Sequence, residues 1–176
     1  MGSDTWGSYK DLPPLLAKKT SILNIRNRDN RCFGYCIAAR LLELESIDQG
    51  IDQAQQHRTR PNNYLPHFPR FGLDNIQYPV SPKDIAAIED QLQIKINIFS
   101  FFDDQGLARY PYYISKKEYE KEVDLLYWDE HYALIKNFSA FLQENQHGSG
   151  VHAMLYCKKC FTPHFSAETL KNHNLY

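Results

Sequence analysis

Long apolar runs are missing from this sequence, and none approaches the roughly 18 consecutive apolar residues of a membrane-spanning helix. The first residues also lack the pattern of a secretory signal. An excess of charge of one sign is missing too, because the formal net charge is −1 at pH 7. Such a balance gives no electrostatic basis for holding nucleic acid or an anionic membrane. We therefore expect neither a membrane nor a nucleic acid among the partners.

Cysteine is scarce, and its placement disfavours a disulfide-stabilised secreted domain. The four cysteines form two close pairs, 32/36 and 157/160. Two disulfides could be drawn between them, but the grouping favours a catalytic site and a metal-binding knuckle. This use of cysteine predicts a reducing compartment, either the cytoplasm or the nucleus.

The composition that is present suits a globular chain with one core. Of the 176 residues, 43% are apolar and 23% are charged, which is ordinary for a folded domain and leaves room for a small appendage. Neither internal repeats nor low-complexity tracts occur. We expect a domain over residues 9–145 and a small module over 151–176, joined by a flexible linker at 146–150. Residues 1–8 are left out of the fold prediction.

A cysteine at the start of a predicted helix is the strongest functional signal. An Asn-rich polar run ends at Cys32, and from there apolar residues recur at helical spacing to about Ser46. Asp29 and Asn30 stand where N-caps belong. Unpaired backbone N–H groups and the helix dipole favour a thiolate in the first turn. We interpret Cys32 as a nucleophile and Cys36, one turn further on, as a structural core thiol.

A thiolate nucleophile needs an imidazole within hydrogen-bond reach and a third group that holds the tautomer of the ring. Of the seven histidines, only His131 begins a segment with the character of a core strand. In such a strand His131, Ala133 and Ile135 share one face, so we expect the ring to point at the cysteine-bearing helix. Asp129, two residues before the histidine, is expected to orient the ring.

Several asparagines offer further roles at this site. Asn137 falls on the face of the predicted base, but about 20 Å along the strand and too far to touch the ring, so it ranks below the aspartate. The tetrahedral intermediate needs donors, normally the backbone N–H of the cysteine and a side-chain amide upstream of it. Asn27 and Asn30 are the candidates for that amide, with Asn24 more distant. We assign the role to Asn27.

The order of these parts is that of a papain-like fold, in which a helix carrying the cysteine is followed much later by a sheet carrying the histidine. We expect the α+β class, with helices packed on one side of a four- or five-stranded antiparallel sheet. Apolar periodicity and turn signals predict helices near 32–46, 51–57, 82–92 and 138–144, strands near 93–101, 108–115, 123–128 and 131–136, and a Pro-rich surface loop over 58–82.

Short motifs in the chain resemble known families. Residues 27–33, Asn-Arg-Asp-Asn-Arg-Cys-Phe, look like the Asn-x-Gly-Asn-Thr-Cys-Tyr box of ubiquitin-specific proteases, with Asp29 in place of its glycine. Asp129-Glu-His131 is similar to the Asp-x-His motif of the viral tegument-like deubiquitinases, which are compact papain-like domains. The chain also resembles the region before the polymerase domain of Polinton-type protein-primed DNA polymerases, through Cys-Phe and the segments 114–119 and 131–137.

The resemblance to viral tegument-like deubiquitinases implies hydrolysis after the C-terminal Gly of ubiquitin or ubiquitin chains, with no cofactor for catalysis. In that interpretation Cys32 is the nucleophile, His131 the base, Asp129 its orienter and Asn27 the oxyanion donor. Two alternatives stay open. One is a cysteine protease that processes the polyprotein of a mobile element, and the other is a non-catalytic binding module attached to a DNA polymerase.

The end of the chain has the spacing of a zinc finger. Cys157 and Cys160 are followed, after twelve intervening residues, by His173, with a phenylalanine and a leucine (Phe165 and Leu170) that would form a small core. A fourth ligand is expected about four to six residues after His173, beyond the last residue of the sequence. His164 is an alternative fourth ligand. We therefore predict a structural zinc ion, against the alternative of two spare thiols on a frayed tail.

Overall fold

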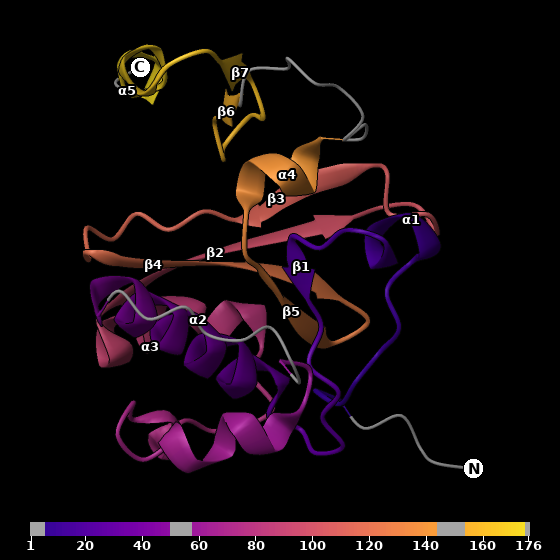
Figure 1. Cartoon of the computed structure of the whole chain (residues 1–176), viewed down its shortest axis with the longest axis vertical. Helices are drawn as coiled ribbons and strands as arrows, with labels where there is room; N and C mark the ends of the chain where they lie inside the picture. Colours follow the sequence, from indigo (N-terminus) through magenta and orange to yellow (C-terminus); the bar gives the residue numbers. More distant parts are fainter. Residues whose placement is uncertain (1–5, 50–57, 144–153, 175–176) are drawn as a thin grey trace.

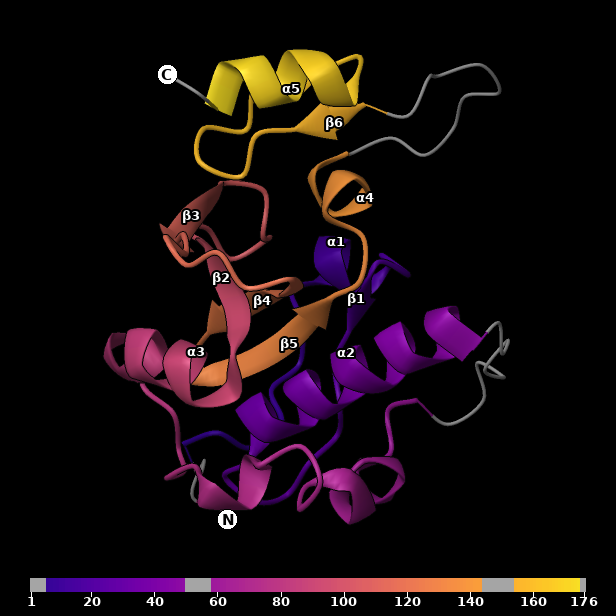
Figure 2. The same cartoon turned by 90° about the vertical axis from the view of Figure 1, so that its left-hand side faces the viewer.

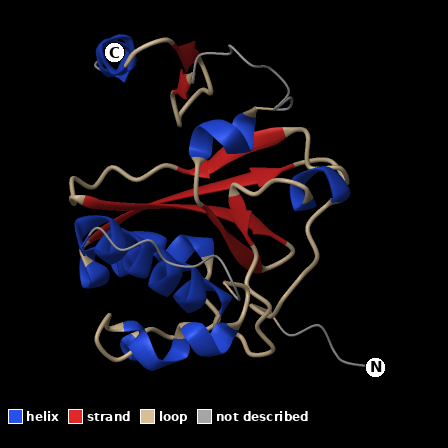
Figure 3. Ribbon diagram, viewed as in Figure 1, coloured by secondary structure: helices blue, strands red, loops and turns tan. Residues whose placement is uncertain are grey.

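The computed structural model describes residues 6–49, 58–143 and 154–174. The helix expected over 51–57 and the linker expected over 146–150 lie outside these residues. The helices are α1 (Pro14–Ala17), α2 (Cys32–Gln49), α3 (Ile85–Leu92), α4 (Phe138–Leu142) and α5 (Ala167–Asn174). The strands are β1 (Ile22–Leu23), β2 (Ile94–Phe101), β3 (Arg109–Tyr113), β4 (Lys121–Trp128), β5 (His131–Ile135), β6 (Leu155–Tyr156) and β7 (Pro163–His164). The chain is thus of mixed α and β content, as expected (Figure 3).

The central sheet has the strand order β1-β5-β4-β2-β3. Its neighbours are antiparallel except β2 and β4, which run parallel from the pair Ile94 and Lys121 to the pair Phe99 and Leu126. The expectation of a wholly antiparallel sheet is therefore wrong for this pair. The reason lies in residues 114–120, which carry the chain from the β3 side of β2 to its other side. There β4 begins level with the start of β2 and runs in the same direction.

Helices cover both faces of the sheet rather than one. Figures 1 and 2 show α2 and α3 on one face and the short α1 and α4 on the other. Side chains that alternate along the strands form a core on each face: Ile96 and Leu125 belong to the core that includes α2, whereas Phe99 and Leu126 pack with Leu16 of α1 and Phe141 of α4. The expectation of helices on a single side is corrected accordingly. None of the described helices is both long enough and apolar enough to cross a membrane.

The Pro-rich segment 58–82 lies against α2. It is folded into short 3-10 turns rather than one open loop. Tyr64 and Phe68 are buried, and the ring of Phe68 lies 5.2 Å from that of Tyr35 on α2. Aromatic side chains thus anchor this segment to the domain.

A buried carboxylate ties α3 to the sheet. Glu89 is fully buried and accepts hydrogen bonds from the backbone N–H of Ile96 at 2.9 Å and from the hydroxyls of Tyr113 and Ser115. We expect Glu89→Ala to lower the free energy of unfolding by about 2–4 kcal/mol, because it leaves two buried donors and the half-buried hydroxyl of Tyr113 without this partner. Asp90→Ala is the matched control, since Asp90 forms an exposed ion pair with Lys117, and such surface pairs add little to stability. Urea unfolding measures both, and equal effects would contradict the prediction.

The C-terminal module docks on the sheet face that carries α4 (Figure 1). The ammonium of Lys158 lies 2.7 Å from a carboxylate oxygen of Glu122 and 3.0 Å from one of Asp124, both on β4. The ring of Phe161 lies tilted at 6.0 Å from that of Phe99 and edge-on at 5.8 Å from that of Phe138. The module therefore shares apolar and charged contacts with the main sheet.

Candidate active site and metal centre

The first turn of α2 and the start of β5 lie against each other. The helix begins at Cys32, as predicted. The backbone N–H of Tyr132 donates to Cys32 Sγ at 3.3 Å, so the thiol lies against the main chain next to His131. Cys36, one turn on, is fully buried and its thiol donates to the carbonyl of Tyr132 at 3.5 Å. This agrees with its interpretation as a core thiol.

Burial has a larger effect on the pKa of Cys32 than its position at the start of a helix. Its side chain is 3% exposed, and desolvation raises its pKa to about 12 although backbone N–H groups of Tyr132 and Phe33 act in the opposite direction. The thiol is therefore neutral in this conformation, which differs from the thiolate expected from the helix dipole alone. Ionisation requires either water at the site or a base that takes the proton during reaction.

The ring of His131 is held by an asparagine rather than by a carboxylate. Its Nε2 lies 2.7 Å from Oδ1 of Asn24, which follows β1. An amide oxygen accepts only, so Nε2 carries the proton and Nδ1 keeps its lone pair. Nδ1 is buried and has no hydrogen-bond partner among the described residues. The ring thus has one nitrogen bonded to an amide oxygen and the other without a hydrogen-bond partner among the described residues.

Asp129 takes a different position from the one predicted. It lies with Glu130 in the two-residue turn between β4 and β5, and both residues are exposed and have positive φ values of 46° and 61°. A left-handed turn breaks the alternation on which the Asp-x-His prediction depends, since that alternation holds only in an extended strand. Asn24 therefore replaces Asp129 as the group in contact with the ring. Asn137 caps α4 by accepting from Ala140 N–H at 3.0 Å.

The face of β5 that packs on α2 also differs from the prediction. Tyr132 and Leu134 belong to the core shared with α2, whereas Ala133 and Ile135 belong to the core on the opposite face. His131 stands at the end of the strand, with its ring edge-on to Trp128 at 5.0 Å and to Tyr9 at 6.1 Å. The contact between β5 and Cys32 is thus made by the main chain of Tyr132.

Both predicted oxyanion donors converge on one oxygen atom. The backbone N–H of Cys32 donates to the carbonyl of Gly7 at 3.2 Å, and Nδ2 of Asn27 donates to the same carbonyl at 2.7 Å. Asn27 is 2% exposed, and its Nδ2 is held in place by the carbonyl of Asp29 at 2.9 Å. Two fixed donors directed at one carbonyl oxygen form the arrangement that stabilises an oxyanion in acyl transfer.

Sequence reasoning missed the positions of Asn24 and Gly7. Asn24 had a weak signal, because a polar residue follows the apolar pair of β1, but its role depends on the pairing of β1 with β5, which places Leu23 opposite Leu134. Gly7 had no signal at all, since it lies outside every predicted element. A pocket of about 540 Å³ is lined by Arg26, Arg28 and Asp29 and by residues 60–62 and 65 of the Pro-rich segment.

The burial of His131 predicts a specific dependence of stability on pH. Desolvation lowers its pKa from 6.5 to about 4, and the main chain of Ser8 offsets this only in part. Between these values the unfolded chain binds a proton that the folded chain does not, so stability falls as the pH falls from 6.5 towards 4. We expect this histidine to account for a loss of about 1.5 kcal/mol between pH 6.5 and 5.

The range between pH 6.5 and 5 suits a measurement of the His131 contribution, because the carboxyl groups with shifted pKa values titrate below it. The pKa values of Glu45, Asp90, Asp103 and Glu122 all lie below their usual values. Urea unfolding of wild type, His131→Asn and the control His67→Asn at several pH values measures the slope. It should flatten in His131→Asn alone, and equal slopes in all three proteins would contradict the prediction.

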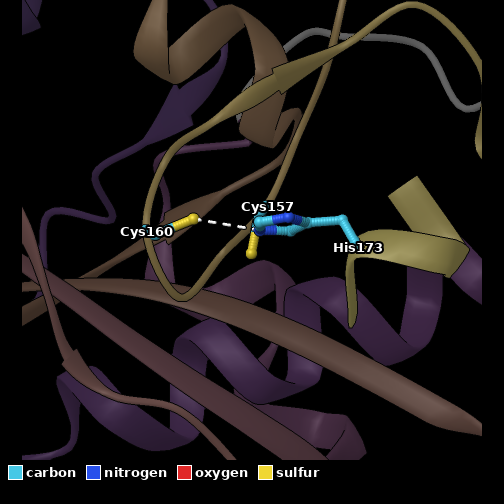
Figure 4. Close-up of side chains that lie close together, drawn as sticks. All are labelled: Cys157, Cys160 and His173. Carbon is cyan, nitrogen blue, oxygen red and sulfur yellow. Dashed lines mark hydrogen bonds between the residues drawn. The ribbon is translucent and has the colours of Figure 1, made fainter. Parts of the chain in front are cut away.

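Three potential metal ligands meet in the C-terminal module. Atoms of Cys157, Cys160 and His173 all lie within 4.8 Å of one another, so this group could hold a metal ion (Figure 4). The Sγ of Cys160 lies 3.3 Å from Nε2 of His173. Hydrogen bonds from Thr162 and from His173 lower the pKa of Cys160 to about 6, and the thiolate is the form that binds metal.

His164 lies beside this group. Its ring centroid is 4.8 Å from that of His173, and its Nε2 is buried without a hydrogen-bond partner among the described residues. The small core expected around Phe165 does not form, because that side chain is 83% exposed. Phe161 instead faces the main sheet. The module therefore gains its apolar contacts from the neighbouring domain rather than from within.

Comparisons of this chain with family models, with curated proteins and with solved structures found no match.

Proposed function

We propose that this chain is a papain-like cysteine hydrolase that cleaves acyl bonds of a peptide or isopeptide. The observation that carries the proposal is the convergence of Cys32 N–H and Asn27 Nδ2 on a single carbonyl oxygen. Such convergence marks where the oxygen of a substrate carbonyl would lie, directly beside the Cys32 thiol. His131, with one nitrogen held by Asn24 and the other unpaired, supplies the base.

In the proposed reaction Cys32 Sγ attacks the substrate carbonyl carbon while its proton passes to Nδ1 of His131. The carbonyl oxygen becomes an oxyanion and accepts from Cys32 N–H and Asn27 Nδ2. The imidazolium then protonates the leaving amine as the carbon–nitrogen bond breaks, which leaves a thioester on Cys32. Water, deprotonated by the same ring, hydrolyses the thioester. Asn24 keeps the ring oriented throughout.

The substrate proposed is ubiquitin or a ubiquitin chain, cut after its C-terminal glycine. Two observations support a glycine at the reacting carbonyl. One is the similarity of residues 27–33 and 129–131 to deubiquitinase motifs. The other is the lack of room for a side chain at the oxyanion hole, the site formed by Cys32 N–H and Asn27 Nδ2. A Cβ atom added to Gly7 would lie 2.5 Å from the carbonyl oxygen of Asn30, so only glycine fits there. The four free cysteines suit a reducing compartment, which we propose to be the cytoplasm or the nucleus.

Ubiquitin carrying a C-terminal electrophile tests this proposal. We expect a covalent adduct with wild type and with Cys36→Ala, and none with Cys32→Ala. Cys36 is the matched control because it is a buried thiol of the same helix that the mechanism does not use. An adduct with a peptidyl-glycine electrophile but not with ubiquitin would indicate a protease that processes a polyprotein. Failure of both electrophiles to label Cys32 would contradict the catalytic proposal and favour a binding module.

For the C-terminal module we propose a structural zinc ion. Cys157, Cys160 and His173 supply two thiolates and one imidazole, the donor set that zinc prefers. We assign the fourth position to His164, because its buried Nε2 lacks a partner and its ring already lies against that of His173. When bound, the ion would join β6 and β7 to α5 and would take no part in hydrolysis.

A further inference from the structure

The segment Trp6–Tyr9 crosses the candidate active site in the manner of a bound peptide. Gly7 N–H donates to the carbonyl of Glu130 at 2.9 Å, and Tyr9 N–H donates to the carbonyl of Asn27 at 3.1 Å. The segment is thus held by main-chain hydrogen bonds from both sides of the site. Proteins that bind extended peptides use main-chain hydrogen bonds of this kind. Between these two bonds, the carbonyl of Gly7 enters the oxyanion hole.

The fit at Gly7 is specific for glycine. Its φ is +87°, a region that other residues rarely adopt, and an added Cβ would approach the carbonyl oxygen of Asn30 to 2.5 Å and its carbonyl carbon to 2.9 Å. These neighbours are backbone atoms, which cannot rotate away as a side chain does. A residue with a side chain at this position would therefore have to leave the hole.

Occupancy of the hole closes the site. Cys32 is 3% exposed and His131 is fully buried, and residues 6–9 supply part of that cover, since Gly7 bonds to Cys32 N–H and the main chain of Ser8 lies at the ring of His131. A substrate carbonyl cannot reach the two donors while the carbonyl of Gly7 accepts from both. Substrate cannot bind in this closed state, so binding requires that residues 6–9 leave the site.

We infer that residues 6–9 form an internal pseudosubstrate, with Gly7 in the place of the substrate's reacting glycine. The segment must leave the hole before a glycyl substrate enters, and it competes with that substrate for the same two donors. This inference rests on the proposed function for the role of the hole. The occupancy of the hole by Gly7, however, can be tested without any substrate.

The test measures how fast iodoacetamide alkylates Cys32 in the full-length chain, read by mass spectrometry of the peptide that contains it. Gly7→Ala should increase the rate at least about 10-fold, because the strain at positive φ and the contact with Asn30 release the segment. Gly106→Ala is the matched control: Gly106 also has a positive φ of +77°, and its added Cβ would lie 2.5 Å from Leu16, which packs in the core on the face of the sheet opposite Cys32. It should leave the rate unchanged.

A second variant guards against a folding defect in Gly7→Ala. A chain without residues 1–7 empties the hole without an introduced side chain and should show the same acceleration. Wild-type rates in both variants, with unchanged circular dichroism, would overturn the inference. Ubiquitin bearing a C-terminal electrophile separates the two proposals. Faster alkylation in the variants without a ubiquitin adduct would support the pseudosubstrate and contradict ubiquitin as the substrate. Alkylation at the wild-type rate together with a ubiquitin adduct would support ubiquitin and contradict the pseudosubstrate.

Discussion

Asn24→Ala should lower kcat for release of a C-terminal fluorophore from ubiquitin by about 10²-fold or more, while Asp129→Ala should change it less than about twofold. The first substitution removes the oxygen that lies 2.7 Å from Nε2 of His131. Without this oxygen the ring can take the tautomer that carries its proton on Nδ1, and a protonated Nδ1 cannot accept the proton of the Cys32 thiol. The second removes a carboxylate exposed in a turn. Steady-state kinetics of the two variants shows whether Asn24 or Asp129 orients the ring of His131.

The pH–rate profile separates positioning from a general structural effect. Asn24→Asp keeps an acceptor at Nε2 but adds a negative charge, which favours the imidazolium. We therefore expect this variant to shift the acidic limb of kcat to higher pH, with most of the rate retained at the plateau. A loss of rate without a shift would indicate a structural role only. A large loss in Asp129→Ala would restore the Asp-x-His assignment.

Removal of zinc should unfold the C-terminal module, because the free energy of binding a structural zinc ion is largely free energy of folding. We expect about one zinc ion per chain in wild type and in the control His67→Ala, and none in Cys160→Ser. Addition of a chelator should make residues 154–174 susceptible to limited proteolysis. Metal analysis and proteolysis followed by mass spectrometry measure these results.

His164→Ala tests the fourth ligand separately. We expect weaker zinc binding by at least about 10-fold and, with cobalt in place of zinc, a changed visible spectrum, since loss of a ligand alters a tetrahedral site. An unchanged spectrum and affinity would show that the fourth position belongs to another ligand. Zinc content near zero in wild type would instead favour two spare thiols.

The parts of the fold that follow from local pattern were predictable. Helix α2 starts at Cys32 because an uninterrupted apolar pattern follows a polar run, and strand β2 is visible in the alternating isoleucines 94, 96 and 98. Each of these features depends on residues that are neighbours in the sequence.

The parts that were not predictable depend on contacts between remote segments. The parallel pairing of β2 with β4 and the contact of Asn24 with His131 arise only once the strand order is fixed. Asp129 was misplaced for a local reason, because two consecutive non-glycine residues with positive φ give no strong signal in the sequence. The position of Gly7 required the shape of the cavity that it fills.

Lys158 makes the boundary between domain and module less complete than the sequence suggests. Its ammonium is shared by two carboxylates of β4, and the same strand leads, at its other end, into the turn before His131. If the module detached, these two acids would lose the ammonium of Lys158, and Glu122 would keep only the attraction of Lys95, so the acids would repel each other more strongly within the strand. Melting of the module should therefore lower the free energy of unfolding of the sheet as well.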